Sequence, residues 1–287
     1  MSIAKILAPL TGGTRDANVL ASAFAAAKPF NAHVVALFVR PDPAEAMPFF
    51  GEGVSGAVVQ EIIDATREAA DKAAEIAKAS LKKAADESGA VVIAAPQKSN
   101  APSASYVEVE GNFADQVSQA SRLSDLIVFG PLSERDKPGL TEAFEAALLE
   151  TGRPILLTAQ TLPRNFARRI AVAWDGSVPC AHAVMAAMPY LAKAEAIEIL
   201  TVQKQVSDQQ KTDDLREYFA LHGLSATTRA IEAGDKPVGE VLLEAAAKSA
   251  DLLVLGGYGH SRLREMFAGG VTRHVVSHAE LPLFLVH

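Results

Sequence analysis

Two glycine-rich turns near the carboxyl end of the chain have the composition of a phosphate-binding site. One runs from Gly256 to Gly259 after an apolar segment, and the other is Gly269-Gly270, directly before a segment of helical spacing. Glycine lets backbone N–H groups approach a ligand closely, and the start of a helix carries partial positive charge. The sequence therefore predicts a polyphosphate site here. His260 and Thr272 stand beside the turns as further hydrogen-bond donors.

An aspartate in the same half of the chain could complete a nucleotide site. Asp175 ends one apolar run, and Val202 ends the next. In an open parallel sheet, ligands bind beyond the carboxyl ends of strands where the strand order reverses. If the strands before Asp175 and Gly256 are neighbours, we expect Asp175 to accept hydrogen bonds from ribose hydroxyls and Val202 to pack against a base. A plainer interpretation stays open, in which the glycines only make tight turns and Asp175 starts an Asx turn with Gly176.

The elements that must position these residues occur twice. Three pairs of segments share a pattern: 6–13 with 170–177, 124–130 with 250–256, and 154–157 with 282–285. The repeat predicts two domains, 1–161 and 162–287, joined near 159–168.

Each copy alternates strands with helices. In the second copy, apolar runs at 169–174, 196–202, 225–231, 251–256 and 282–286 predict strands, and helices are expected at 179–192, 211–222, 237–248 and 271–279. Such alternation is typical of an α/β fold, here two tandem doubly wound parallel sheets. The first copy carries extra residues within 41–105. There the apolar residues Val58, Ile62, Ala69, Ala73, Ile76 and Leu81 predict one long amphipathic helix over 57–87.

The glycine motif resembles that of the universal stress protein family. The resemblance rests on Gly256-x-x-Gly259, nine residues and Gly269, and on the opening segment Ile170 to Ser177. It covers the second copy closely and the first in outline, so the chain looks like a tandem member, a fused version of the family's usual dimer. The resemblance implies a five-stranded fold like that of the adenine nucleotide alpha hydrolases, binding of an adenine nucleotide, and a role in stress survival without an established reaction.

The resemblance also assigns roles to single residues. Ala173 and Asp175 would lie on the adenine and ribose side, and Val202 would touch the adenine. The phosphates would be lined by Gly256, Gly259, Gly269, Gly270, Val271 and Thr272. The expected ligand is ATP, with Mg²⁺ as an optional companion. The family places Ser or Thr directly after the last motif glycine, whereas this chain has Gly270 there, so one side-chain hydroxyl is lost.

The first copy departs further from the motif. Thr11 stands where the second copy has Asp175, Ser133 stands in place of Gly259, and Pro131 removes a backbone donor. We expect no family-type ATP site in this half. The segment Thr11 to Asp16 resembles, faintly, a pyrophosphate-binding loop of ATP-dependent enzymes, but an ordinary turn with Asp16 in the first helical turn is the better interpretation.

Other reactive side chains carry less information. His274 and His278 are four residues apart on a predicted helix, a spacing open to a metal, although an exposed pair is favoured and no metal is expected. Cys180, the only cysteine, stands beside a helix start and could have a lowered pKa or be a small buried hydrophobe. No catalytic base stands out, so at most slow ATP hydrolysis is expected.

Composition narrows the class of protein. The chain has 287 residues, 49% of them hydrophobic, and a formal net charge of -7, which argues against a uniformly basic nucleic-acid binder. A single cysteine and the lack of a long apolar run favour a cytoplasmic protein without a membrane span. Two alternatives to ATP sensing remain: a nucleotide-free interaction protein that uses the segment around 41–56 and the long helix, and an enzyme that uses the loop from Thr11. A further homodimer also stays open.

Overall fold

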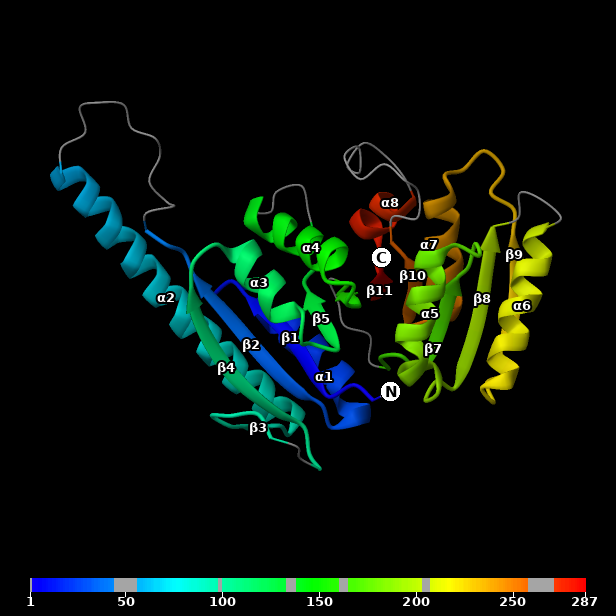
Figure 1. Cartoon of the computed structure of the whole chain (residues 1–287), viewed down its shortest axis with the longest axis horizontal. Coiled ribbons are helices and arrows are strands. Elements are labelled where there is room, and N and C mark those ends of the chain that lie inside the picture. Colours follow the sequence, from blue (N-terminus) through cyan, green and yellow to red (C-terminus); the bar gives the residue numbers. More distant parts are fainter. Residues whose placement is uncertain are drawn as a thin grey trace. The chain divides into compact units, whose positions relative to one another are not determined.

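The computed structural model describes residues 2–43, 56–97, 100–132, 138–159, 165–202, 207–257 and 271–287. They form two compact units (Figure 1). The amino-terminal unit comprises Ala4–Val128 and Asp136–Thr151, and the carboxy-terminal unit comprises Gly152–His287 with the short pieces Met1–Ile3 and Phe129–Arg135. The predicted alternation of strands and helices is confirmed in both copies.

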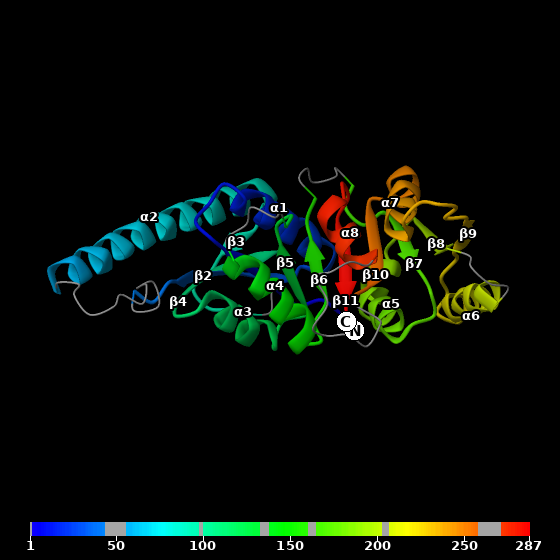
Figure 2. The ribbon, with the colours of Figure 1, turned by 90° about the horizontal axis from the view of Figure 1, so that it is seen from above.

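The amino-terminal copy is built around a parallel sheet. Its elements are β1 (Lys5–Leu10), α1 (Asp16–Ala27), a 3₁₀ turn (Lys28–Phe30), β2 (His33–Arg40), α2 (Gly56–Ser88), β3 (Val91–Val92), β4 (Ser103–Glu110), α3 (Phe113–Ser121), β5 (Leu126–Phe129) and α4 (Pro138–Glu150). The strands pair in the order β3-β4-β2-β1-β5. Helices α1 and α2 cover one face of this sheet, and α3 and α4 cover the other (Figure 2). The predicted doubly wound fold is therefore present.

The carboxy-terminal unit repeats this plan. Its elements are β6 (Ile155–Leu157), β7 (Arg169–Ala173), α5 (Val178–Leu191), β8 (Ala196–Val202), α6 (Ser207–Leu221), β9 (Thr227–Ile231), α7 (Val238–Ser249), β10 (Leu252–Gly256), α8 (Val271–His278) and β11 (Leu283–Val286). The strand order is β6-β11-β10-β7-β8-β9, in which only β6 runs antiparallel. Helices α5 and α6 lie on one face of the sheet and α7 and α8 on the other (Figure 2).

A pair of aspartates shows the repeat in atomic detail. In the first copy, the Asp125 carboxylate accepts hydrogen bonds from the N–H groups of Ala4 and Lys5, at 2.8 and 3.0 Å. In the second copy, Asp251 accepts from the N–H of Arg169, at 3.1 Å. Each aspartate thus fixes the start of the first strand of its copy from the start of a neighbouring strand, β5 in the first copy and β10 in the second.

The strands that end the two copies pair with each other. Leu283 lies opposite Leu157, and Leu285 lies opposite Ile155, in an antiparallel ladder between β11 and β6. Each of these strands thus covers an edge of the other. Backbone donors and acceptors that an edge strand would expose are satisfied in this way.

The long helix of the first copy is confirmed, but the face that it buries differs from the predicted one. The helix buries a stripe of small residues that recurs every three or four positions: Ala70, Ala74, Ala77, Leu81, Ala84 and Ala85. Ile76, which was predicted to face the core, is 50% exposed. Alanine-rich sequences leave the phase of the buried stripe undetermined, and close packing of α2 against α1 selects the small residues. Strand β4 begins at Ser103, inside the segment that was expected to be inserted, and α2 stands where α6 stands in the second copy.

Among the described residues, no helix has both the length and the apolar character required to cross a bilayer.

Candidate functional site

The predicted nucleotide crevice lies at the point where the strand order of the carboxy-terminal unit reverses. Ile170 to Val172 of β7 pair with Leu252 to Val254 of β10, so the first and fourth strands of this copy are neighbours. From this pair the chain continues through β8 and β9 on one side and through β11 on the other. Asp175 and Gly256, which follow and end these two strands, therefore lie at the same edge, as the sequence predicted.

Asp175 is exposed and is held by an Asx turn. Its Oδ1 accepts a hydrogen bond from the N–H of Ser177, at 2.8 Å. Gly176 between them has a φ of +77°, a backbone conformation that suits glycine. The Ser177 hydroxyl in turn caps helix α5 by accepting from the N–H of Cys180, at 3.4 Å. The plainer interpretation of Asp175 is therefore correct as geometry, and the turn fixes the carboxylate at the crevice.

Gly256 has a packing reason to be glycine. A Cβ atom at this position would lie 2.5 Å from the backbone nitrogen of Cys180 and 2.6 Å from the carbonyl carbon of Pro179. Since real Cβ atoms do not approach backbone so closely, the first turn of α5 can rest on the end of β10 only because residue 256 has no side chain. The sequence indicated a phosphate role for this glycine and gave no sign of this contact.

Side chains around the crevice fix the neighbouring elements. The Trp174 indole N–H donates to the carbonyl of Lys211 at the start of α6, at 2.8 Å. Val202 is half-buried at the end of β8 and lies opposite Ile231 of β9. Ala173 is 7% exposed, and its carbonyl accepts a hydrogen bond from the Cys180 thiol, at 3.5 Å. Ala173 can thus offer a ligand only a small contact surface. No sequence signal had identified the hydrogen bond between Trp174 and Lys211.

The phosphate side of the predicted site falls largely outside the described residues. Gly259, His260 and Gly269-Gly270 lie there, as does the side chain of Thr272. Val271 is described and begins α8, which packs on α7 where Gly239 lies close to the Val271 carbonyl. The N–H end of α8 therefore starts at the predicted position.

The equivalent turn of the first copy is closed by its own carboxylate. Asp16, 1% exposed, accepts hydrogen bonds from the N–H groups of Thr11 and Gly12, at 3.0 and 2.8 Å. Burial raises the pKa of this carboxyl, and the hydrogen bonds from the turn oppose that rise. A pyrophosphate at these two amides would have to displace Asp16, which argues against the enzyme alternative.

Helix α2 also covers this turn, and the two copies differ in what lies there. A Cβ on Gly12 would lie 2.4 Å from the carbonyl oxygen of Ala73 in α2. In the second copy the equivalent atom on Gly176 would meet the Cδ of Lys211, at 2.8 Å. Helix backbone covers the turn in the first copy, whereas the end of a flexible side chain does so in the second. The nearest atoms over the turn are therefore helix backbone in the first copy and side-chain atoms of Lys211 in the second.

The remaining reactive side chains serve structure. Burial raises the pKa of the Cys180 thiol, so the expectation of a lowered value was wrong and the small buried hydrophobe is confirmed. The rings of His274 and His278 stack with centroids 4.3 Å apart. Within the described ranges, no three His, Cys, Asp or Glu side chains come together as a metal site.

A family model of known proteins matches the second copy of the repeat. In doubly wound α/β domains, ligands bind at the switch point, where this unit has a strand-end aspartate. Residues 166–287 match the model of the universal stress protein family. This part of the chain is therefore similar to the universal stress proteins, as its glycine motif indicated.

Solved structures extend the likeness in fold to the whole chain. A universal stress protein from Archaeoglobus fulgidus DSM 4304 superposes with a TM-score of 0.68 at 16% identity, over 98% of this chain and 95% of that one. A proposed universal stress protein from Pseudomonas aeruginosa UCBPP-PA14 gives 0.57 at 14% identity, over 99% and 93%. A protein of unknown function from Pseudomonas aeruginosa PAO1 gives 0.59 at 13% identity, over 99% and 92%. No curated protein sequence matches the chain.

Proposed function

We propose that this chain is a tandem universal stress protein that binds ATP in its carboxy-terminal half and acts in a stress response by sensing the nucleotide. The observation that carries the proposal is the pairing of β7 with β10, which brings Asp175 and the start of the glycine motif to one sheet edge. Asp175 would accept hydrogen bonds from the ribose hydroxyls, and Val202 would contact the adenine. The backbone N–H groups of the glycine turns would hold the phosphates, with Mg²⁺ between them where it is present.

The two copies have different roles in this proposal. Asp16 and α2 occupy the turn of the first copy, so one nucleotide binds per chain. The pairing of β6 with β11 supports an arrangement in which the first copy serves as a built-in counterpart of the second. The single cysteine favours a cytoplasmic location.

Calorimetric titration with ATP and Mg²⁺ tests the site. Asp175→Ala should weaken binding roughly tenfold or more, because a hydrogen bond to a charged group contributes about 1.5–3 kcal/mol. Gly259→Val should weaken it too, by filling the phosphate turn. Thr11→Ala, at the equivalent position of the first copy, is the matched control and should bind as the wild type does. Equal, weak binding in all four proteins would refute the proposal.

We propose that the protein binds ATP without hydrolysing it rapidly. ATP recovered after incubation with the protein should remain largely intact when measured by chromatography. Steady accumulation of ADP that disappears in Asp175→Ala would instead identify an ATPase.

One observation favours the interaction alternative. Buried residues of α2 begin only at Ala70, and the earlier half of the helix extends beyond the strands (Figure 2). Val58 on this half is 44% exposed. If the exposed half binds a partner protein, Val58→Glu should abolish co-purification of that partner and leave ATP affinity unchanged. Deleting the whole helix would not test this, since its second half belongs to the core.

A further inference from the structure

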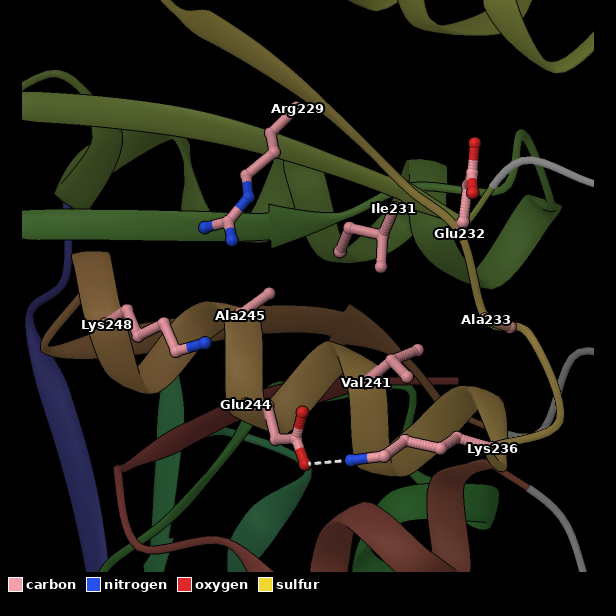
Figure 3. A pocket seen from close by; sticks show the side chains of 9 residues that line it. All are labelled: Arg229, Ile231, Glu232, Ala233, Lys236, Val241, Glu244, Ala245 and Lys248. Atoms are coloured by element: carbon pink, nitrogen blue, oxygen red, sulfur yellow. Dashed lines mark hydrogen bonds and ion pairs between the residues drawn. The ribbon is translucent and has the colours of Figure 1, made fainter.

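A second pocket lies apart from the nucleotide crevice, between the edge strand β9 and helix α7 (Figure 3). Its volume is about 220 Å³. A water molecule occupies about 30 Å³ in the liquid, so the pocket has room for a small organic molecule in place of roughly seven waters. Neither β7 nor β10, which form the crevice, contributes a residue to its lining.

The wall of this pocket is apolar in its middle part. Ile231 projects from β9 toward Val241 of α7, and Ala245 follows one turn further along the helix (Figure 3). Val241 is 7% and Ala245 4% exposed, so both belong to the packed interior and form a rigid surface. A flat or short apolar group could cover Ile231 and remove it from water.

Two cations line one end of the pocket. Arg229 extends from β9 toward α7, and Lys248 extends along α7 with its ammonium below the guanidinium (Figure 3). No hydrogen bond or ion pair with the part of the chain that the structure describes engages either side chain. Two like charges that line the same end of a pocket repel each other, and a bound anion would reduce this repulsion.

The acidic residues of the pocket balance these two cations only in part, because Glu244, which attracts Lys248, also pairs with a third cation. Glu244 pairs with Lys236, with Nζ and Oε1 2.5 Å apart, and Lys236 also pairs with Glu240, at 3.0 Å. The Glu232 carboxylate points away from α7 (Figure 3). The end formed by Arg229 and Lys248 is therefore positive, although the whole chain has a formal net charge of -7.

We propose that this pocket binds a small phosphomonoester, with its phosphate between Arg229 and Lys248 and its organic part over Ile231 and Val241. A phosphomonoester carries nearly two negative charges at neutral pH, which matches two cations. The planar guanidinium can bind two phosphate oxygens at once, and the lysine can bind a third from the opposite wall. The proposal is independent of the nucleotide site, because the two sites share no residue.

Phenyl phosphate is a suitable probe, with inorganic phosphate and phenol as its two halves. In methyl-labelled protein, phenyl phosphate should shift the resonances of Ile231 and Val241 in a saturable titration. Inorganic phosphate should bind at least about threefold more weakly, since it covers no apolar surface. Equal affinity for inorganic phosphate would overturn the assignment of an organic ligand.

Charge variants test the two cations. Arg229→Gln and Lys248→Gln should each weaken phenyl phosphate binding about tenfold. Lys82→Gln, on the exposed side of α2, makes the same change in net charge and should leave binding unchanged. All three side chains project from the surface, so unchanged circular dichroism is expected. Wild-type affinity in Arg229→Gln and Lys248→Gln would overturn the proposal.

Competition separates this pocket from the crevice. Phenyl phosphate should bind equally well to the wild type and to Asp175→Ala, and ATP at saturation of the crevice should not displace it. Displacement by ATP, together with loss of ATP affinity in Arg229→Gln, would make the pocket a part of the nucleotide site and overturn its independence.

Discussion

Substitution of Gly256 by alanine separates two reasons for a glycine at the end of β10. If the glycine serves only to let a phosphate approach, Gly256→Ala should lose ATP affinity and keep its stability. If it serves to let helix α5 rest on the strand, the protein without ligand should already be less stable. The contact distances favour the second outcome.

The expected loss of stability in Gly256→Ala follows from the contact distances. The new Cβ would lie 2.5 Å from the nitrogen of Cys180, whereas ordinary contact begins at 3.4 Å. The obstructing atoms are backbone, so the first turn of α5 would have to move by roughly 1 Å. Overpacking of this kind costs about 1–3 kcal/mol. Because 1 kcal/mol corresponds to roughly 2–4 °C in a unit of this size, we expect the Tm to fall by roughly 2–12 °C.

Differential scanning calorimetry without nucleotide measures this effect. Gly139→Ala is the matched control, because its Cβ would meet only the Cβ of Phe113, at 3.9 Å, and alanine is the better helix former. Its Tm should be unchanged or higher. A Gly256→Ala protein that unfolds at the wild-type temperature would refute the packing argument. Because α5 follows Asp175 directly, the packing argument also predicts weaker ATP binding.

Three further predictions concern other buried groups. Gly12→Ala places a Cβ 2.4 Å from the Ala73 carbonyl oxygen at a φ of +69°, so urea unfolding should show a loss of about 3 kcal/mol; a variant of wild-type stability would mean that α2 does not cover the turn. The Cys180 thiol, with its pKa raised by burial, should react with a disulfide reagent at pH 8 only after unfolding, and rapid labelling of the native protein would contradict this. Burial also raises the pKa of the Asp251 carboxyl above its ordinary value of 3.8, so the folded state binds a proton at Asp251 more tightly than the unfolded state does. The contribution of this proton to the stability of the folded state is therefore full below pH 3.8, and it falls as the pH rises through the folded pKa. Urea unfolding over this range should therefore show the wild type losing stability relative to Asp251→Asn, and parallel pH profiles would count against the shift.

The two copies show how one fold can keep or lose a site. Both have a glycine with positive φ directly after the turn that follows the first strand, Gly12 and Gly176. In the first copy a buried Asp16 and a long second helix cover that turn. In the second copy the turn presents an exposed Asp175, and the atoms nearest to Gly176 belong to the side chain of Lys211. Lengthening of one helix thus changes a candidate binding turn into part of the core.

The sequence by itself determined the repeat, the alternation of strands and helices, and the family of the second copy. These features depend on local patterns: apolar runs that end in Asp-Gly or Gly-Gly, and helical spacing between them. It also placed Asp175 and Gly256 at one edge, because the order of strands in doubly wound sheets is restricted.

Only the tertiary structure decided which contacts these residues make. The clash that requires glycine at 256 involves Cys180, far away in the sequence, and the presence of Arg229 and Lys248 in one pocket depends on how β9 and α7 pack. The buried face of α2 was likewise decided by its neighbour α1, since alanines suit either side of a helix. Such contacts join residues that are distant in the chain, and their energies depend on distances of a few tenths of an ångström that no local pattern records.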